Sequence, residues 1–460
     1  MREILANNEL NPNSQDYSLL TDLYQLTMSA CYAGEGIANK KASFELFMRR
    51  LPDNFGYLIA MGLTQAIEYL EQLSFNSQQI QALQDTDIFN SAPNEFWQLL
   101  ESGSFTGDVW AVPEGTAVFE NEPILRIEAP LWQAQLVETY LLNTINYQTL
   151  IATKAARIRD VAGKEANILE FGTRRAFSPQ GAIWAARAAL AAGFDGTSNV
   201  LAALKLGRKP KGTMAHALVM AISAISGGED EAFKAFQTYF PHAPLLIDTY
   251  DTVAAVKRLQ NKVDAGEMMV TGVRIDSGNL VELSQKVSFH LPETKIFASG
   301  DLDEWEIARL KREGAYIDGY GIGTKLVTGE TVNGVYKLVE IDCIPTMKKS
   351  SNKATYPGRK QIFRTVIDGI TKSDRLGLHD EQPQNNEHGL LIKVMQEGKT
   401  LQPAETLAQI RQRTANSVAS LPDEIKNINI NSSQNFTVNI SNALRSLQKS
   451  IADKNSTIDN

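Results

Sequence analysis

The chain has 460 residues, too many for one ordinary core, with a formal net charge of -8 and a pI near 5.4. This acidic balance argues against nucleic acid as a partner, and no apolar stretch predicts a signal peptide or a membrane span. The two cysteines, Cys31 and Cys343, fit neither a disulfide framework nor a metal-binding spacing, which indicates a reducing, cytoplasmic setting.

The first third of the chain predicts an arm followed by an N-terminal α/β domain. Residues 1–16 are polar and predict a flexible arm. Residues 19–34 place apolar side chains at helical spacing, and residues 41–50 alternate as a strand does. Apolar runs between turns over residues 107–127 predict further strands, so we place this domain at residues 17–130.

A long helical run from residue 131 leads into short apolar strands that alternate with helices, the pattern of a parallel α/β architecture. The predicted strands are residues 168–171, 193–197, 212–215, 244–248, 269–275, 295–299 and 316–321. Polar residues and glycines follow each strand, and in a barrel such strand ends converge on one mouth. We therefore predict an α/β barrel catalytic domain over residues 131–340. Residues 341–460 are predicted to pack back on the N-terminal domain with strands and to end in a helical tail.

One histidine is a candidate functional residue. His216 stands where the predicted strand 212–215 passes into an apolar helix, whereas the other four histidines have polar or loop-like contexts. A single histidine at a helix start is often a satisfied core or capping residue. The polar strand ends elsewhere in the same region favour a functional role instead.

Carboxylates also gather at the predicted strand ends: Asp248, Asp251, Asp276 and Asp301. Carboxylates placed in this way bind Mg²⁺ through one or two oxygens while the metal keeps water and substrate phosphates. Helix capping is the alternative, and it has equal weight for Asp251 and Asp301. For Asp276 we favour a function.

Anion-binding groups accompany these carboxylates. Gly300, Gly321 and Gly323 let backbone amides approach an anion beside a helix N-terminus, which predicts a monophosphate site. Guanidinium groups that hold a carboxylate or phosphate are available at Arg49 with Arg50, at Arg174 with Arg175 and at Arg274, and surface solvation is the alternative for one arginine of each adjacent pair. Phe171 and Tyr24 are aromatic platforms for a flat heterocycle, with core packing as the alternative.

Seven sequence blocks together resemble the nicotinate phosphoribosyltransferase family, in the family's order over residues 17–340. The blocks are LLTDLYQLTM at 19–28, EFGTRR at 170–175, GTSN at 196–199, GTMAH at 212–216, GVRIDSG at 272–278, ASGDL at 298–302 and GIGT at 321–324. Several long blocks in order are far more specific than any one of them.

The resemblance implies an ATP-dependent ligase of NAD biosynthesis. Such an enzyme joins nicotinate to phosphoribosyl pyrophosphate, giving nicotinate mononucleotide and pyrophosphate, and couples this to ATP hydrolysis through a phosphohistidine, here His216. The resemblance also implies a type II phosphoribosyltransferase barrel and Mg²⁺ as cofactor. A head-to-tail homodimer is implied as well, in which a neighbouring subunit supplies Tyr24 and Arg49 to the site.

Residue roles follow from motif position in the resemblance. The catalytic group is His216, Asp276 and Arg274, with Asp276 as the Mg²⁺ ligand. The substrate-binding residues are Tyr24, Phe171, Arg174, Ser198, Asn199 and Thr213, of which Tyr24 and Phe171 stack on the pyridine ring and Arg174 holds the carboxylate. The phosphate-binding residues are Arg49, Ser299, Gly300, Gly323 and Thr324.

Two positions help to distinguish a nicotinate-using enzyme from a catalytically silent relative and from a nicotinamide-using enzyme. The family has an acid where this chain has Asn279, which weakens a metal-binding role there and favours a catalytically silent relative, although His216 and Asp276 oppose that. A nicotinamide-using enzyme has an aspartate where this chain has Ser198, so a carboxylate substrate fits better. A metal-dependent hydrolase would need clustered histidine ligands, and only His216 follows a predicted strand.

Overall fold

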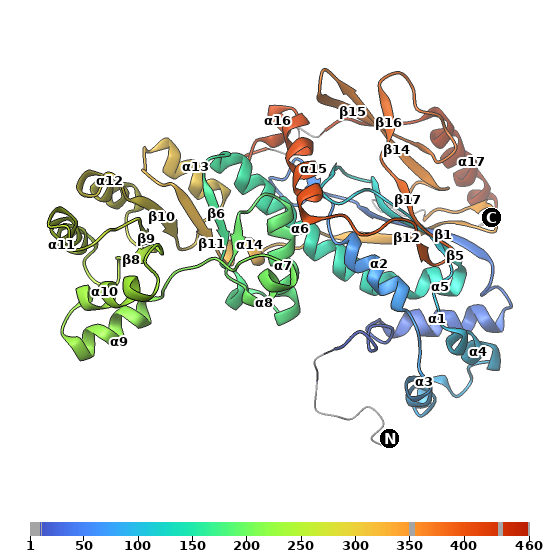
Figure 1. Ribbon diagram of the computed structural model, residues 1–460. Helices are drawn as coiled ribbons and strands as arrows, with labels where there is room; N and C mark the ends of the chain where they lie inside the picture. The colour runs from blue at the N-terminus through green and yellow to red at the C-terminus, as the bar shows by residue number, and fades with distance from the viewer. Residues whose placement is uncertain (1–9, 11, 349–354, 431–435, 459–460) are drawn as a thin grey trace. The chain divides into compact units, whose positions relative to one another are not determined.

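The computed structural model describes residues 10, 12–348, 355–430 and 436–458 (Figure 1). Contacts divide the chain into two compact units. The first unit combines Met1–Leu150 with Thr331–Asn460, and the second is Ile151–Glu330. The second unit is therefore inserted, in sequence, into the first.

The first unit is built on an antiparallel sheet of seven strands. Their order is β13 (Ile344–Pro345), β12 (Gly334–Ile341), β1 (Lys41–Met48), β5 (Pro123–Pro130), β3 (Asp108–Ala111), β17 (Ile392–Gln396) and β18 (Lys399–Thr400). A pair, β2 (Leu58–Ile59) and β4 (Ala117–Val118), lies apart from this sheet. Strand β1 was predicted from its alternation, yet seven of its eight residues are buried, because both of its faces are covered.

The helices of the N-terminal part are α1 (Leu23–Gly34), α2 (Leu63–Gln72), α3 (Ser77–Gln84), α4 (Asn94–Ser102), α5 (Leu131–Leu136) and the start of α6 (Glu138–Ala162), with the 3-10 turn η1 (Asp87–Phe89). Helix α1 begins four residues later than the predicted 19–34, because residues 14–20 form turns. Helix α5 packs on β1 and β5, which places one layer of helix on the sheet.

The C-terminal part adds a second sheet, in the order β16 (Glu387–Gly389), β14 (Lys360–Ile367), β15 (Ile370–Leu378) and β19 (Val438–Ile440). Its helices are α15 (Leu407–Ser420), α16 (Asp423–Lys426) and α17 (Asn442–Ile458). Within the described ranges, no helix has both the length and the apolarity needed to cross a membrane.

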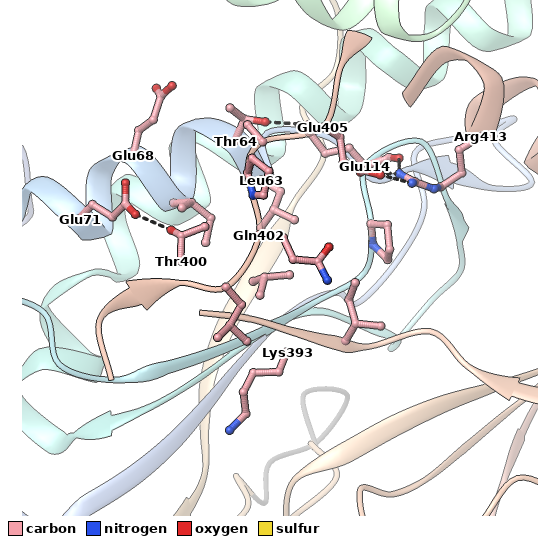
Figure 2. Close-up of a pocket in the computed structure, with 17 residues that line it drawn as sticks. Leu63, Thr64, Glu68, Glu71, Glu114, Lys393, Thr400, Gln402, Glu405 and Arg413 are labelled. Carbon is pink, nitrogen blue, oxygen red and sulfur yellow. Dashed lines mark hydrogen bonds and ion pairs between the residues drawn. The ribbon is translucent and has the colours of Figure 1, made fainter. Parts of the chain in front are cut away.

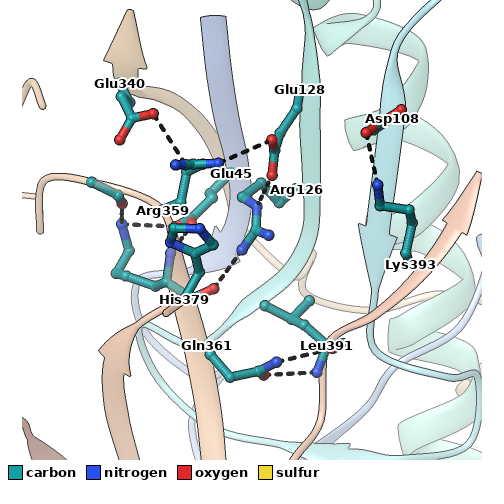
Figure 3. A network of polar contacts seen from close by, with 12 residues as sticks. Glu45, Asp108, Arg126, Glu128, Glu340, Arg359, Gln361, His379, Leu391 and Lys393 are labelled. Carbon is teal, nitrogen blue, oxygen red and sulfur yellow. Dashed lines mark hydrogen bonds and ion pairs between the residues drawn. The ribbon is translucent and has the colours of Figure 1, made fainter. Parts of the chain in front are cut away.

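Buried charges join the C-terminal strands to the first sheet (Figure 3). The Lys360 ammonium lies 2.8 Å from a Glu45 carboxylate oxygen, and the Lys360 backbone N–H donates to the other oxygen at 2.8 Å. Arg126 donates to the Lys360 carbonyl at 2.6 Å and to Glu128 at 2.9 Å. Burial lowers the pKa of Lys360 while Glu45 opposes this shift. Because each charge has a partner, the network is tolerated inside the unit and fixes strand register.

The second unit contains a parallel sheet of six strands (Figure 1). Their order is β7 (Gly196–Thr197), β6 (Asn167–Glu170), β11 (Gly319–Ile322), β10 (Lys295–Ser299), β9 (Gly272–Ile275) and β8 (Leu245–Leu246). The helices are α7 (Pro179–Ala191), α8 (Val200–Lys205), α9 (His216–Ser226), α10 (Glu229–Tyr239), α11 (Thr252–Asp264), α12 (Leu280–His290), α13 (Glu304–Arg312) and α14 (Thr324–Val327), with the 3-10 turn η2 (Thr173–Arg175). The predicted parallel α/β architecture is confirmed.

Closure of the predicted barrel is not confirmed. The strands follow one another in the cyclic order of a barrel, but no ladder joins β7 to β8 among the described residues. The predicted strand 212–215 is irregular backbone in this gap. Lys211 donates one hydrogen bond to the Thr197 carbonyl at 2.9 Å, and Pro210 beside it has no N–H to donate. This segment therefore carries its residues past the end of β7 without extending the sheet.

Candidate active site

The ends of β6 and β7 are fastened together by one buried carboxylate. Glu170, the last residue of β6, accepts hydrogen bonds from the Gly172 N–H and the Thr197 hydroxyl, one at each oxygen. Its own carbonyl accepts from the Ser198 N–H at 2.9 Å. Burial raises the pKa of Glu170, and the two side-chain hydrogen bonds lower it again. Glu170 therefore sets the position of the Phe171–Arg174 turn relative to Ser198.

The Phe171 ring has a defined seat in the second unit. A Cβ on Gly321 of β11 would lie 2.5 Å from the ring, so only glycine leaves room for it. The Arg274 guanidinium lies 5.9 Å from the centre of the ring, within cation-π range. Arg174 lies in η2, three residues after Phe171, is exposed, and adds positive charge near Arg274. A ring beside one guanidinium group, with a second close to that group, suits a flat anion.

The Arg274 side chain is mostly buried and is held in place by its surroundings. It donates to the Met214 carbonyl at 3.0 Å, while its Nε is buried with no hydrogen-bond partner in the part of the chain that the structure describes. Burial lowers the pKa of Arg274, and Asp276 and Asp248 oppose that shift. An anion that accepts from Nε would remove the cost of an unmade hydrogen bond.

Two aspartates and two serines organise the ends of β8, β9 and β10. Asp248 accepts at Oδ2 from the Asp276 N–H at 2.9 Å and from the Ser277 hydroxyl at 2.7 Å. The Ser299 hydroxyl donates to Asp276 Oδ1. Asp248 Oδ1 is buried and has no hydrogen-bond partner within the described chain. These carboxylates offer oxygen donors that fit a cation held jointly with substrate phosphates, as Mg²⁺ commonly is.

His216 is the first residue of α9 and is half-buried. Its Nδ1 lies 3.1 Å from the Thr249 hydroxyl oxygen, and Thr249 follows Asp248 directly. When Nδ1 carries the proton and donates it to Thr249, Nε2 keeps a free lone pair. Thr213, three residues earlier, turns its hydroxyl to the Met214 carbonyl at 3.3 Å.

The glycine-rich turns follow β10 and β11. Gly300 has a φ of +92°, and a Cβ there would lie 2.2 Å from the Asp276 carbonyl, so a side chain is excluded. Gly323 precedes α14, whose first residue is Thr324. The turns thus bring backbone rather than side chain to this edge of the sheet, as an anion site requires.

Helix capping was the alternative left open for Asp251 and Asp301, and two asparagines of this region also cap helices. Asp251 caps α11 by accepting from the Ala254 N–H at 2.9 Å, whereas the cap of α13 is Asp303 and not Asp301. Asn279 caps α12 through the Glu282 N–H at 3.4 Å. Asn199 caps α8 through the Ala202 N–H at 2.9 Å. The amide oxygen at Asn279 therefore serves the helix, as the carboxylate of an aspartate at this position would.

The remaining predicted residues lie in the first unit. Tyr24 is on α1, with 47% of its surface exposed, and Arg49 follows β1. Their roles stay predictions. Among the described residues, no three His, Cys, Asp or Glu side chains converge as a metal-ligand set, as the hydrolase alternative would need.

Comparison with known proteins identifies the family to which this chain belongs. The sequence matches the nicotinate phosphoribosyltransferase N-terminal domain over residues 19–146, the nicotinate phosphoribosyltransferase family over residues 166–343 and the corresponding C-terminal domain over residues 384–448. The chain belongs to the nicotinate phosphoribosyltransferase family. The nicotinate phosphoribosyltransferase of Bacillus subtilis is 45% identical over 384 residues, covering 79% of this chain and 77% of that protein. One of Mycobacterium tuberculosis is 40% identical over 427 residues, covering 89% of each chain.

Solved structures agree with this assignment. The crystal structure of human nicotinic acid phosphoribosyltransferase superposes with a TM-score of 0.79 at 28% identity, covering 94% of this chain and all of that one. A nicotinate-nucleotide pyrophosphorylase from Pyrococcus furiosus, at 24% identity and a TM-score of 0.72, shares the fold. Proteins with low sequence identity to this nicotinate phosphoribosyltransferase family member therefore have the same fold.

Sequence reasoning missed the positioning role of three residues in this nicotinate phosphoribosyltransferase family member. Glu170 was noted only within a motif, Asp248 only among the carboxylates suited to Mg²⁺, and Thr249 was not considered for the site. Glu170 is the last residue of β6, and Asp248 and Thr249 lie two and three residues after β8, so position at a strand end was the available signal. Their hydrogen bonds, however, join segments 27 to 33 residues apart.

Proposed function

We propose that this chain transfers the phosphoribosyl group of phosphoribosyl pyrophosphate to nicotinate, forming nicotinate mononucleotide and pyrophosphate in NAD biosynthesis. The observation that carries the proposal is family membership along most of the chain, from residue 19 to 448. The placement of Phe171, Arg274 and Asp276 at the carboxyl ends of β6 and β9 in one sheet supports it.

Nicotinate is a flat ring with one carboxylate, and the site offers a group for each part. The Phe171 face stacks on the pyridine ring, and the exposed Arg174 guanidinium holds the carboxylate in a forked geometry. The Arg274 Nε supplies a further donor in the same region. Ser198 leaves the site without the acid that would repel a carboxylate. Asn199 and Thr213 contribute through their loops.

Phosphoribosyl transfer needs positioning and charge neutralisation more than covalent chemistry. The bond from ribose C1 to pyrophosphate breaks as the pyridine nitrogen approaches, so positive charge develops at C1 and negative charge on the leaving oxygens. Asp276, positioned by Ser299 and by Asp248, binds the ribose hydroxyls and the cation. Mg²⁺, when bound, neutralises the pyrophosphate oxygens. Backbone amides at Gly300, Gly323 and Thr324, together with Arg49, hold the 5-phosphate.

ATP coupling is assigned to His216. The Nδ1 proton is donated to Thr249, which leaves the Nε2 lone pair to attack the γ-phosphorus of ATP. The bond to the β-phosphate oxygen breaks, ADP leaves, and the Nε2–phosphorus bond is later hydrolysed by water to inorganic phosphate. The enzyme acts in the cytoplasm as a homodimer in which the neighbouring subunit supplies Tyr24 and Arg49.

The test is an assay of nicotinate mononucleotide formation from nicotinate, phosphoribosyl pyrophosphate and Mg²⁺, with and without ATP. Wild type should form product, and ATP should accelerate it. His216→Ala should keep an ATP-independent rate and lose the acceleration, while His242→Ala, an exposed histidine of the same unit, should behave as wild type. Absence of product from nicotinate, or turnover of nicotinamide alone, would exclude the substrate assignment. Acceleration by ATP in His216→Ala would exclude the phosphohistidine.

A further inference from the structure

The first unit contains a cavity that the transfer reaction does not use. It has a volume of about 580 Å³ and is lined by 17 residues from α2, the turn before β4, β17 and the segment that leads to α15 (Figure 2). The cavity is partly open to solvent, so it is a surface site and not a packing void of the interior. It falls in the range of sites for small organic ligands.

The walls of the cavity are apolar. Eight of the lining residues are Leu63, Ile67, Pro113, Ile392, Val394, Leu401, Pro403 and Ala404. Ile392 and Leu401 are each 47% exposed, which is unusual for large apolar side chains facing a hollow. A ligand with an apolar body would cover them and remove that surface from water.

A strap, residues 401–406, closes one side and is held at both ends. Before it, the Thr400 hydroxyl donates to Glu71 of α2. Near its far end, Glu405 pairs with Arg413, and Arg413 also donates to the Glu114 carbonyl at 2.7 Å. Between these ties, residues 402–405 make no backbone hydrogen bond to any other described residue. The cavity is therefore preformed, with one wall that can adjust.

The charges around the cavity are predominantly acidic. Four glutamates line it, Glu68, Glu71, Glu114 and Glu405, against two cations, Lys393 and Arg413. Both cations are engaged, because Lys393 pairs with Asp108 at 2.9 Å and points away from the cavity (Figure 2). Arg413 and Glu405 neutralise each other, which leaves Glu68, Glu71 and Glu114 in excess. An anion such as nicotinate or a nucleotide would be repelled here, whereas a cation would be attracted.

We propose that this cavity binds a small organic cation, a molecule with an apolar or aromatic body and one ammonium group. The body lies between Leu63 and Ile67 of α2 and Val394 of β17, and the ammonium lies toward Glu71. The site is separate from the reaction, and its occupant differs in charge from every substrate of that reaction.

The experiment uses two fluorescent probes with the same dansyl body and a similar alkyl chain. One, dansylcadaverine, ends in an ammonium, and the other, dansyl-6-aminohexanoate, ends in a carboxylate. Titrated into the full-length protein, the cation should bind saturably at one site. The anion should bind at least about tenfold more weakly, the ratio that about 1.4 kcal/mol gives.

Three variants locate the binding. Ala404→Trp, on the exposed strap, fills the cavity and should abolish the saturable signal. Glu71→Gln keeps an acceptor for Thr400 and removes one charge, so it should weaken the cation by roughly threefold. Glu95→Gln, an exposed glutamate of α4 outside the cavity, should change nothing. Circular dichroism establishes that each variant folds.

Three results would overturn the proposal: no saturable binding of the cation, equal binding of both probes, or undiminished binding in folded Ala404→Trp. Fluorescence reports binding whether or not the protein turns over nicotinate. A failure here is therefore distinguishable from a failure of the proposed reaction.

Discussion

Removing the Glu170 carboxylate should damage nicotinate binding through two loops at once. In Glu170→Ala the Thr197 hydroxyl and the Gly172 N–H lose their acceptor, and both residues are buried. An unmade buried hydrogen bond costs about 1–3 kcal/mol, so the loops carrying Phe171 and Ser198 should shift to find other partners. A shift of about 1 Å costs roughly 100-fold in a positioned reaction.

We therefore expect kcat/KM for nicotinate to fall by about 10- to 100-fold in Glu170→Ala, mostly through KM. Glu170→Gln should recover most of it, because its carbonyl accepts from Gly172 and its amide can donate to Thr197. That hydroxyl then loses its acceptor, so a deficit of roughly threefold should persist. The exposed Glu165→Ala, near the start of the same strand, is the control.

Initial rates with nicotinate and phosphoribosyl pyrophosphate varied separately test this reasoning. Glu170 acts by positioning, so the nicotinate KM should change more than the phosphoribosyl pyrophosphate KM. The reasoning is refuted if Glu170→Ala, folded by circular dichroism, keeps the wild-type nicotinate KM. It is also refuted if Glu170→Gln is no better than Glu170→Ala.

Three other outcomes follow from contacts described above. Thr249→Val removes the hydrogen bond at His216 Nδ1, which contributes about 1 kcal/mol, so the ATP-stimulated rate should fall about fivefold while the ATP-independent rate stays the same. An unchanged response to ATP would contradict this. Glu304→Gln removes the negative charge that lies 2.9 Å from the buried Arg157 guanidinium. It should lower the stability of the second unit by about 3–5 kcal/mol in thermal unfolding, and a loss below about 1 kcal/mol would contradict this expectation. Burial, then Asp374, raises the pKa of Glu122 well above its ordinary value. The folded carboxyl thus keeps a proton that the unfolded one has lost, so the free energy of unfolding in urea should fall as pH rises through the folded pKa. Glu122→Gln should reduce this dependence on pH, and an equal dependence in both proteins would contradict the role of Glu122.

The sequence located the parallel strands well where local signals were strong. The strand predicted at 295–299 is β10 as observed, and 168–171 is β6 shifted by one residue. The segment 212–215 is not a strand, because strand formation depends on a partner that β7 and β8 do not provide. Composition alone could not show this.

The helix caps and the positioning residues, in contrast, could not be predicted from local sequence. Asp303 rather than Asp301 caps α13, a choice between two acids in one short turn that only backbone geometry decides. The positive φ of Asp301, 48°, is incompatible with the extended conformation of a capping residue. Glu170 and Asp248 act across strands, so their partners emerge only when the sheet is assembled.

The insertion of the second unit into the first has a consequence for synthesis on the ribosome. Strand β1 pairs with β5 on one side early, but its other edge is completed only by β12, which is translated after the whole second unit. At roughly 5–20 residues per second, that edge waits for many seconds. An unpaired edge of a largely apolar strand invites pairing with other chains. The nascent protein is therefore most dependent on chaperones between the emergence of β5 and that of β12, while the second unit already folds.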